Sequence, residues 1–207
     1  MVTETGIEGD RSFGLRDTET GNILTARRCP DLLFASARWH EGSVTITLPD
    51  GTETHEDQAL SAWLQRPVEL VSTGEAGTFE NPLDVVNESD WVSWTGPTDS
   101  FHDSARNRIS AVSLDSLGTW DERRFRKNII VNIGGENELV GQTLHVGGAT
   151  LTVTKQVARC VMVTRAQPDV DRDLNVFKTI NRERDGNLGI AMTIDSPGVI
   201  QVGDAIV

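Results

Sequence analysis

Cysteine, long apolar runs and basic residues are all scarce in this sequence, and each scarcity excludes a class of protein. Only two cysteines, Cys29 and Cys160, occur among 207 residues. Two are too few for a disulfide framework, so we expect both to be thiols in a reducing compartment. No apolar run approaches the roughly 20 residues that span a bilayer, and the first residues lack the basic and apolar regions of a secretory signal. We therefore expect a cytoplasmic protein with no membrane partner.

Basic residues are outnumbered by acidic ones. The chain has 19 Lys and Arg against 31 Asp and Glu, which gives a net charge of -12. We expect no nucleic-acid partner, because neutralising phosphates requires a basic face. With 37% hydrophobic and 24% charged residues, the composition is that of an ordinary globular chain, long enough for one large domain or two small ones.

Four of the 19 basic residues are clustered in one short stretch. Residues 123–128 read Arg-Arg-Phe-Arg-Lys-Asn and run directly into the β-branched residues 129–131. A hairpin predicted over residues 144–157, with a Gly-Gly turn, leads to Arg159 and Cys160. Cationic side chains at one strand and a thiol at the end of another indicate a pocket for an anionic ligand with a sulfur ligand in it.

Cys160 and the basic stretch each have a plainer interpretation. A free cysteine is commonly a small buried apolar residue, and a run of charges is commonly a solvated patch. If the strand continues through Cys160, the thiol shares the more polar strand face with Thr154, Gln156 and Thr164. The concentration of arginine in an acidic chain favours a local binding role. Both interpretations stay open from these residues alone.

Many short strands with glycine turns and few helices predict a mainly β fold, a β-rich barrel. A hairpin is predicted from strands at residues 9–15 and 23–25, which places Arg11 and Arg27 on paired strands. Residues 72–100 are rich in turn residues and are predicted as a loop. Further strands are predicted at residues 32–35, 43–48, 108–112, 129–131, 188–194 and 199–202.

Helices are predicted at three places. Thr54 and Asp57 resemble a capping box before a short helix. Ser113 is a plausible N-cap for a helical turn. The clearest helix is predicted over residues 171–185 and is ended by Gly186.

Short motifs distributed over nearly the whole chain also carry a family resemblance. They are Gly9-Asp10-Arg11, Leu24-Thr25-Ala26-Arg27, Phe101-His102-Asp103, Arg124-Phe125-Arg126-Lys127-Asn128, Arg159-Cys160 and residues 198–204. In this order they resemble the MOSC family, named after the C-terminal domain of molybdenum cofactor sulfurase. Each motif is weak alone, and the shared order makes the resemblance specific.

The resemblance implies a fold and a cofactor. The fold is mainly β (α+β): a MOSC-type β-barrel over residues 101–207 with a few short helices, and a smaller N-terminal β-lobe over residues 1–75. Residues 76–100 would be a connecting loop. Molybdenum cofactor (Mo-molybdopterin) would bind between the two parts.

The resemblance also implies site residues. Cys160 would be the catalytic residue and the thiolate that binds molybdenum, and a soft thiolate suits a metal that already holds two dithiolene sulfurs. Guanidinium groups would make charge-assisted hydrogen bonds to phosphate and pterin acceptors. The implied cofactor-binding residues are Arg11, Arg27, Ser110, Arg126 and Asn128.

The sequence departs from the family pattern in two places. Family members of this type begin with an extra strand and a Lys-Ser segment that helps to hold the cofactor phosphate. This sequence starts after that segment, so we expect an N-terminal lobe that is truncated at its start. The family's Asp-Pro after the cysteine corresponds to Gln167-Pro168.

Three functions are compatible with these residues. The first is an oxidoreductase that reduces small N-hydroxylated or N-oxygenated compounds and takes electrons from an electron-donor protein. The second is a carrier that holds sulfur on Cys160 as a persulfide, received from a sulfurase partner, or holds the cofactor for delivery. The third is a cofactor-free interaction module. Enzyme activity is therefore one of several expectations.

Overall fold

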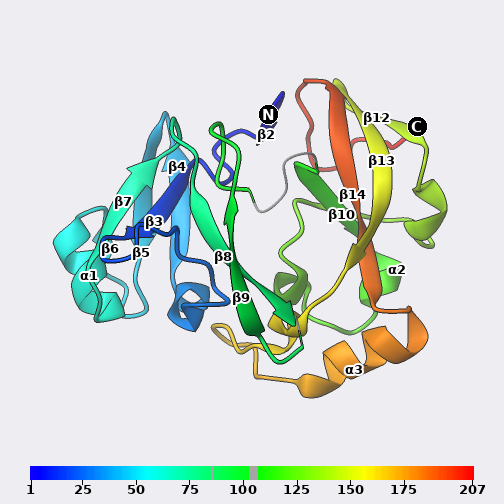
Figure 1. The fold of residues 1–207 in the computed structure, drawn as a ribbon. Coiled ribbons are helices and arrows are strands. Elements are labelled where there is room, and N and C mark those ends of the chain that lie inside the picture. Colours follow the sequence, from blue (N-terminus) through cyan, green and yellow to red (C-terminus); the bar gives the residue numbers. More distant parts are fainter. Residues whose placement is uncertain (85, 103–106) are drawn as a thin grey trace. The chain divides into compact units, whose positions relative to one another are not determined.

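The computed structural model describes residues 1–84, 86–102 and 107–207, and the chain folds into two compact units (Figure 1). One, called here the C-terminal unit, comprises residues 1–8, 104–166 and 170–207. The other, called the N-terminal unit, comprises residues 9–103 and 167–169. The start of the chain thus belongs with its C-terminal half. Each helix in the described residues is too short or too polar to cross a lipid bilayer.

A curled, half-barrel sheet of five strands forms the C-terminal unit, which confirms the prediction of a mainly β fold. Its order is β11-β10-β14-β13-β12; β10 and β11 are parallel and the other pairs are antiparallel. The strands are β10 (Ile109–Ser113), β11 (Ile129–Val131), β12 (Thr143–Val146), β13 (Ala149–Ala158) and β14 (Asn187–Ser196). A short hairpin, β1 (Val2–Thr3) with β2 (Gly6–Ile7), precedes them.

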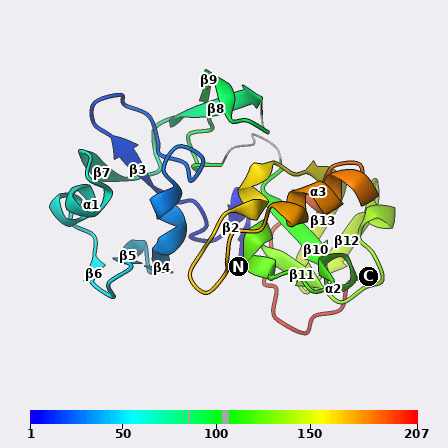
Figure 2. The ribbon, with the colours of Figure 1, turned by 90° about the horizontal axis from the view of Figure 1, so that it is seen from below.

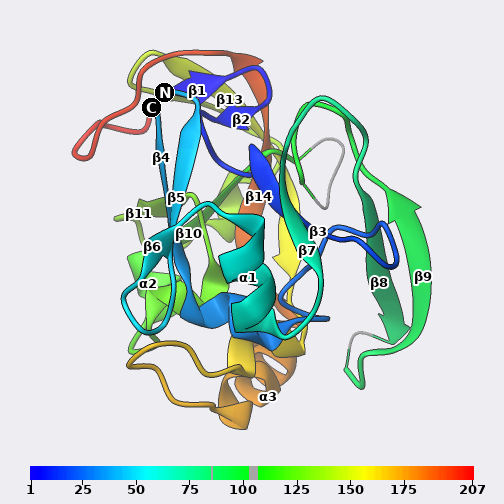
Figure 3. The same ribbon diagram turned by 90° about the vertical axis from the view of Figure 1, so that its left-hand side faces the viewer.

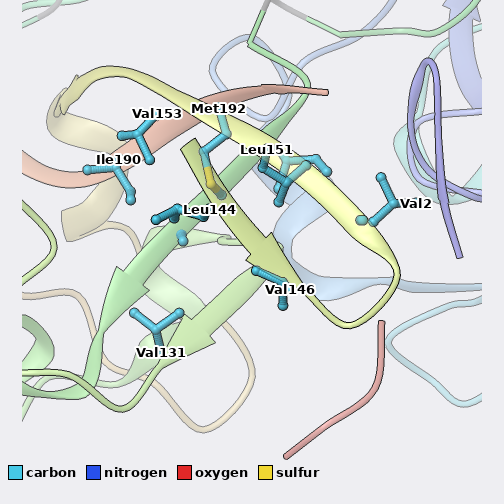
Figure 4. Close-up of a cluster of buried hydrophobic side chains, with 11 residues drawn as sticks. Val2, Val131, Leu144, Val146, Leu151, Val153, Ile190 and Met192 are labelled. Carbon is cyan, nitrogen blue, oxygen red and sulfur yellow. The ribbon is translucent and has the colours of Figure 1, made fainter. Parts of the chain in front are cut away.

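Alternate residues of these strands form the core of the sheet. Leu151 and Val153 of β13 and Ile190 and Met192 of β14 are almost completely buried, together with Val2 from the first strand (Figure 4). Successive side chains of a strand point to opposite faces, so such alternation buries one face. Each fully buried aliphatic side chain stabilises the fold by about 1.5–3 kcal/mol.

The two α-helices of this unit cover a second cluster. The helix α2 (Leu114–Leu117) starts at Ser113, whose hydroxyl accepts from the amide of Ser116, as its N-cap role predicts. The helix α3 (Leu174–Glu183) lies where β13 ends and β14 begins (Figures 1 and 3). It is shorter than predicted, because Asp173 caps it through the Asn175 amide at 2.8 Å.

The last segment of the chain differs from the prediction, because residues 199–202 form no strand. Instead, Gly198 forms an isolated bridge with Val2, with backbone N···O distances of 2.9 and 3.1 Å. A Cβ atom at Gly198 would collide with the backbone of Gly148 and lie 2.7 Å from the Ala149 nitrogen. The hairpin turn at Gly147-Gly148 therefore packs directly on the backbone of this segment.

Gly198→Ala is expected to lower the free energy of unfolding by about 2 kcal/mol, because the added methyl group meets backbone that cannot rotate away. Urea unfolding of the purified chain measures this loss. Gly134→Ala is the matched control, because a Cβ atom there meets nothing within 4 Å. Equal stability of the two variants would contradict the close packing at Gly198.

In its described residues, the N-terminal unit has three small sheets, one α-helix and one 3-10 helix (Figure 2). The α-helix, α1 (Asp57–Leu64), packs against the strand β7 (Val68–Ser72) (Figure 3). The sheets pair β3 (Phe13–Asp17) with β7 (Val68–Ser72), β4 (Ser36–His40) with β5 (Ser43–Thr47) and β6 (Glu53–Thr54), and β8 (Thr78–Asp84) with β9 (Ser89–Thr95).

Several predictions for this unit were wrong. Residues 32–35 do not form a strand, since Pro30–Phe34 is a 3-10 helix, and the partner of β5 is β4. The returning strand predicted at 23–25 is one bridge between Ile23 and Arg16. The predicted loop at 72–100 contains the β8–β9 hairpin.

The short helix after Thr54 is confirmed as α1 (Asp57–Leu64), but its start is held differently from a capping box. The Thr54 hydroxyl accepts from the Glu56 amide at 3.0 Å, and the Asp57 carboxylate accepts from the Leu70 amide at 2.7 Å. Asp57 thus ties α1 to β7 instead of closing the helix end on itself.

Candidate functional site

Cys160 follows the end of β13 and does not lie on a strand face. The strand ends at Ala158 because its partner β14 begins at Asn187, and Cys160 is the N-cap of a 3-10 helix, η4 (Val161–Thr164). The prediction that the thiol shares a strand face with Thr164 is therefore wrong. Cys160 is partly buried, and Cys29 and Cys160 form no disulfide with each other. The thiol sits at a chain turn, where a ligand can approach more easily than on a packed strand.

Arg159, immediately before the thiol, is fixed by several contacts. Its Nε donates to the Leu188 carbonyl at 2.9 Å and its Nη1 to the Phe125 carbonyl at 3.4 Å. The guanidinium carbon lies 5.3 Å from the centre of the Phe125 ring, a cation–π distance. Its Nη2 is buried and has no hydrogen-bond partner within the described residues. Such an atom is expensive to leave unpaired, so it marks a place where a ligand atom can accept.

The electrostatic surroundings of Arg159 work in two directions. Burial lowers its pKa to about 10, while the charges of Cys160 and Glu136 oppose that shift. The guanidinium therefore stays positive at neutral pH.

The basic stretch is only partly a cluster. Arg123 turns back to pair with Asp121, the residue that caps the 3-10 helix η2 (Glu122–Phe125). Arg124 instead reaches the segment after the thiol, donating to the carbonyls of Val163 at 3.4 Å and Asp171 at 2.6 Å. The solvated interpretation thus fits Arg123, and Arg124 braces the chain that follows Cys160.

Arg126 lies at the end of η2 in the left-handed backbone region, with φ 50° and ψ 46°. Non-glycine residues adopt this conformation at a cost, and such residues gather at functional sites. Its side chain is exposed, and Asn128, another implied cofactor contact, follows two residues later in the chain.

We expect Arg126→Gly to be more stable than Arg126→Ala by about 1 kcal/mol, because glycine adopts positive φ without a Cβ penalty. Both variants lose the same side chain, so their difference isolates the backbone. Thermal or urea unfolding of the pair gives the value. An alanine variant as stable as the glycine variant would show that the backbone at this position is not strained.

Ser110 and Asn128 are brought together by three hydrogen bonds. The Asn128 side-chain Oδ1 accepts from the Ser110 backbone N–H at 3.0 Å and from the Ser110 hydroxyl at 3.1 Å. The Asn128 backbone N–H donates to the Ser110 carbonyl at 3.1 Å. The asparagine oxygen therefore links the start of β11 to β10. The two implied site residues thus form a hydrogen-bonded pair whose geometry is set by the sheet.

Arg11 and Arg27 belong to the N-terminal unit, and neither lies on a strand. The prediction that they sit on paired strands of one hairpin is wrong. Arg11 lies in the turn before β3 with φ 56° and forms an ion pair with Asp10. Arg27 lies in a turn and its Nη1 donates to the Asn81 side chain on β8 at 2.8 Å.

The β8–β9 hairpin, which the sequence analysis did not predict, contacts the turn that contains Arg27 and Arg28. Arg28, next to Arg27, makes two hydrogen bonds of 2.9 Å to Glu80 and lies 3.9 Å from the centre of the Trp91 ring. Glu80 is on β8 and Trp91 on β9. Asp103, the third residue of the Phe101-His102-Asp103 motif, lies outside the described residues.

Glu136 is a site residue that sequence reasoning missed. Its side chain is completely buried in the C-terminal unit and accepts from the Ser113 amide at 3.1 Å and the Gly189 amide at 2.8 Å. Burial is the largest influence on its pKa and raises it, but hydrogen bonds from Ser113 and Ser116 outweigh burial and lower the pKa. The sequence around it, Gly-Gly-Glu-Asn-Glu, is typical of an exposed turn, so no local signal marks it.

Comparison with known protein families identifies both parts of the chain. Residues 80–207 match the MOSC domain, and residues 1–93 match the MOSC N-terminal beta barrel domain. The chain belongs to the MOSC family. MOSC domains are generally associated with molybdenum cofactor binding. No curated protein matches the chain.

The residues of the C-terminal unit fit such a cofactor. Within the described residues, no group of three or more His, Cys, Asp or Glu side chains gathers as a metal site. Cys160 offers one soft thiolate, which suits a metal whose other ligands come from a dithiolene group. The Nη2 of Arg159, which has no hydrogen-bond partner in the part of the chain that the structure describes, suits an anionic oxygen or a ring nitrogen. Among the described residues of this MOSC chain, the site thus offers one cysteine sulfur with a cation beside it.

Proposed function

We propose that this MOSC protein binds molybdenum cofactor and uses it to reduce small N-hydroxylated or N-oxygenated compounds with electrons from a donor protein. The observation that carries the proposal is the pair at the end of β13. Cys160 supplies a partly exposed thiol, and Arg159 beside it keeps a buried N–H group without a hydrogen-bond partner in the described residues.

The chain's own residues have separate tasks in this proposal. Cys160 would be the protein ligand to the metal, and Arg159 would hold an anionic acceptor beside it. Arg126 and the Ser110–Asn128 pair would contact the pterin. Arg11 and Arg27 would contact its anionic end. When bound, the cofactor supplies the two-electron redox chemistry.

The fixed surroundings of Arg159 explain why the site needs arginine. Its planar group makes hydrogen bonds in two directions to backbone carbonyls and stacks on Phe125, while a third nitrogen is left for a ligand. Lysine is a point charge on a flexible stem and cannot hold all of these positions at once. Arg159→Lys would therefore keep the charge and lose the geometry.

The test begins with metal and pterin content. The full chain is purified without oxygen from a host that makes the cofactor, and molybdenum and pterin are measured per chain. Close to one of each supports the proposal, and no molybdenum contradicts it. The loaded protein is then given a chemical electron donor and an N-hydroxylated compound. Turnover supports the reductase, whereas bound cofactor without turnover, or a persulfide on Cys160, points to a carrier.

A further inference from the structure

One peptide group of β14 is displaced from the regular sheet pattern. In the pairing of β13 with β14, Gln156 faces Ile190 and Ala158 faces Asn187. Val157 is therefore opposite two residues, Leu188 and Gly189, which makes a β-bulge. Gly189 has φ +81°, a value open to glycine but unfavourable for a residue with a Cβ atom. A bulge of this kind turns a peptide out of the ladder and aims it elsewhere.

The displaced peptide is held at both of its ends by opposite charges. Its carbonyl, that of Leu188, accepts from Arg159 Nε at 2.9 Å. Its N–H, that of Gly189, donates to Glu136 Oε1 at 2.8 Å. The carbonyl and the N–H belong to the same peptide group. The chain of contacts therefore runs from the guanidinium through one planar amide to the carboxylate, and the peptide dipole is aligned with the two charges.

Glu136 is anchored independently of this peptide. Its other oxygen accepts from the Ser113 amide at 3.1 Å, at the end of β10. The side chain has no exposed surface, and a buried carboxylate is costly unless hydrogen bonds satisfy it. An apolar side chain at this position would avoid that cost. The carboxylate therefore contributes something other than packing.

We propose that Glu136 is a positioning residue for Arg159, and that it acts through the Leu188–Gly189 peptide. The carboxylate fixes the plane of that peptide, and the peptide carbonyl fixes the Arg159 Nε. With Nε and Nη1 both on backbone carbonyls, the Nη2 of the guanidinium is the nitrogen left for a ligand next to Cys160. The identity of that ligand rests on the function proposed above; the positioning does not.

The close surroundings of Gly189 leave no room for a larger residue. A Cβ atom there would lie 2.7 Å from the Ala111 carbonyl oxygen and 2.8 Å from the Lys127 side chain. The peptide thus has room only with hydrogen at this Cα. Gly189 therefore allows the bulged peptide to form, and the Glu136 carboxylate holds it in place.

The test uses nitrogen-15 NMR on the full chain as purified. Two signals are followed: the Gly189 amide, which touches Glu136, and the Arg159 Nε–H, which does not. In Glu136→Gln we expect hydrogen exchange at both groups to speed up by at least about tenfold, because a neutral carboxamide holds the peptide less firmly. Glu138→Gln is the matched control, since Glu138 is an exposed carboxylate two residues away. It should change neither signal.

The outcomes distinguish positioning of Arg159 by Glu136 from a role of Glu136 limited to the Gly189 peptide. If Glu136→Gln alters the Gly189 amide and leaves the Arg159 Nε–H unchanged, the carboxylate is a local anchor and the proposal is wrong. If Glu136→Gln does not fold, Arg159→Lys tests the same chain of contacts from its other end. That variant must change exchange at the Gly189 amide, and an unchanged amide overturns the proposal.

Molybdenum content of the same samples separates this proposal from the function. Reduced metal in Glu136→Gln, beside a loaded wild type, would show that the positioning serves the cofactor. A wild type without metal would contradict the proposed function, while the NMR result would still decide whether Glu136 positions Arg159.

Discussion

Asp17→Asn is expected to lower the free energy of unfolding by about 3 kcal/mol. Asp17 is 1% exposed, forms an ion pair with Arg66, and accepts from the amides of Glu19 and Thr20 at 2.9 Å each. It closes the turn after β3 and ties that turn to Arg66, two residues before β7. Asparagine keeps the shape but loses the charge and replaces one acceptor by a donor.

Because this stabilisation depends on the charge of Asp17, we expect the stability of the fold to fall at acidic pH. Burial is the largest influence on the Asp17 pKa and raises it, but the amides of Thr20 and Glu19 and the charge of Arg66 outweigh burial and lower the pKa. A group whose pKa is lower in the folded state stabilises the fold above its unfolded pKa, about 3.9 for Asp. This stabilisation is lost as the pH falls from there through the folded pKa. The variant should therefore show a smaller loss of stability than the wild type between pH 5 and pH 3.

Tryptophan fluorescence measures this prediction well. Four of the five tryptophans, Trp39, Trp63, Trp91 and Trp94, lie in the N-terminal unit, so their emission reports its unfolding in urea. Asp50→Asn is the control: Asp50 also accepts a turn amide, that of Thr52 at 2.9 Å, but on the surface. A loss as small in Asp17→Asn as in Asp50→Asn would contradict the structural role of the Asp17–Arg66 pair.

Cys160→Ala is expected to remove most of the bound molybdenum. The variant loses the soft ligand that the proposed function assigns to the metal. It should keep its fold, because Cys160 is partly exposed at the start of η4 and its loss removes little packing. Metal content per chain, measured beside a urea unfolding curve, distinguishes a lost ligand from a lost fold.

Cys29→Ala is the matched control for that variant. Cys29 is 5% exposed in the core of the N-terminal unit, and burial, with help from the charge of Asp31, raises the pKa of its thiol. A neutral thiol is a poor metal ligand. This variant should therefore keep its molybdenum and lose stability on the order of 1 kcal/mol. Metal loss in Cys29→Ala alone would contradict the assignment of Cys160.

Local chemistry was enough to predict several elements. The Gly147-Gly148 hairpin, the Ser113 cap and the helix before Gly186 depend on neighbouring residues, so the sequence specifies them. Residues 32–35 were wrongly predicted as a strand because a short apolar run fits both a strand and a buried helical turn. Pro30, at the first position of that turn, was the available signal.

The β8–β9 hairpin was missed for a different reason. Its residues are mostly polar, and β8 contains Pro82, which is typical of edge strands. What stabilises it includes the packing of Trp94 on Phe79, whose ring centres lie 5.5 Å apart, and such a contact has no sequence period.

The site shows the same division between local and distant contacts. The family motifs named Cys160, Arg126 and Asn128, and the Asn128–Ser110 link is compatible with the shared role that the resemblance implies. Glu136 could not be found in this way, because its partners are 23 and 53 residues distant in the chain. Long-range hydrogen bonds to a bulged strand become visible only in the folded protein.

X-ray absorption at the molybdenum edge tests the central claim, that the Cys160 thiolate binds the metal. Wild type and Cys160→Ser are prepared from the same cofactor-producing host and their sulfur ligands are counted. Serine keeps the shape of the side chain and replaces sulfur by oxygen. We predict one sulfur ligand fewer at molybdenum in Cys160→Ser than in wild type. The same number of sulfur ligands in the two proteins would contradict the account.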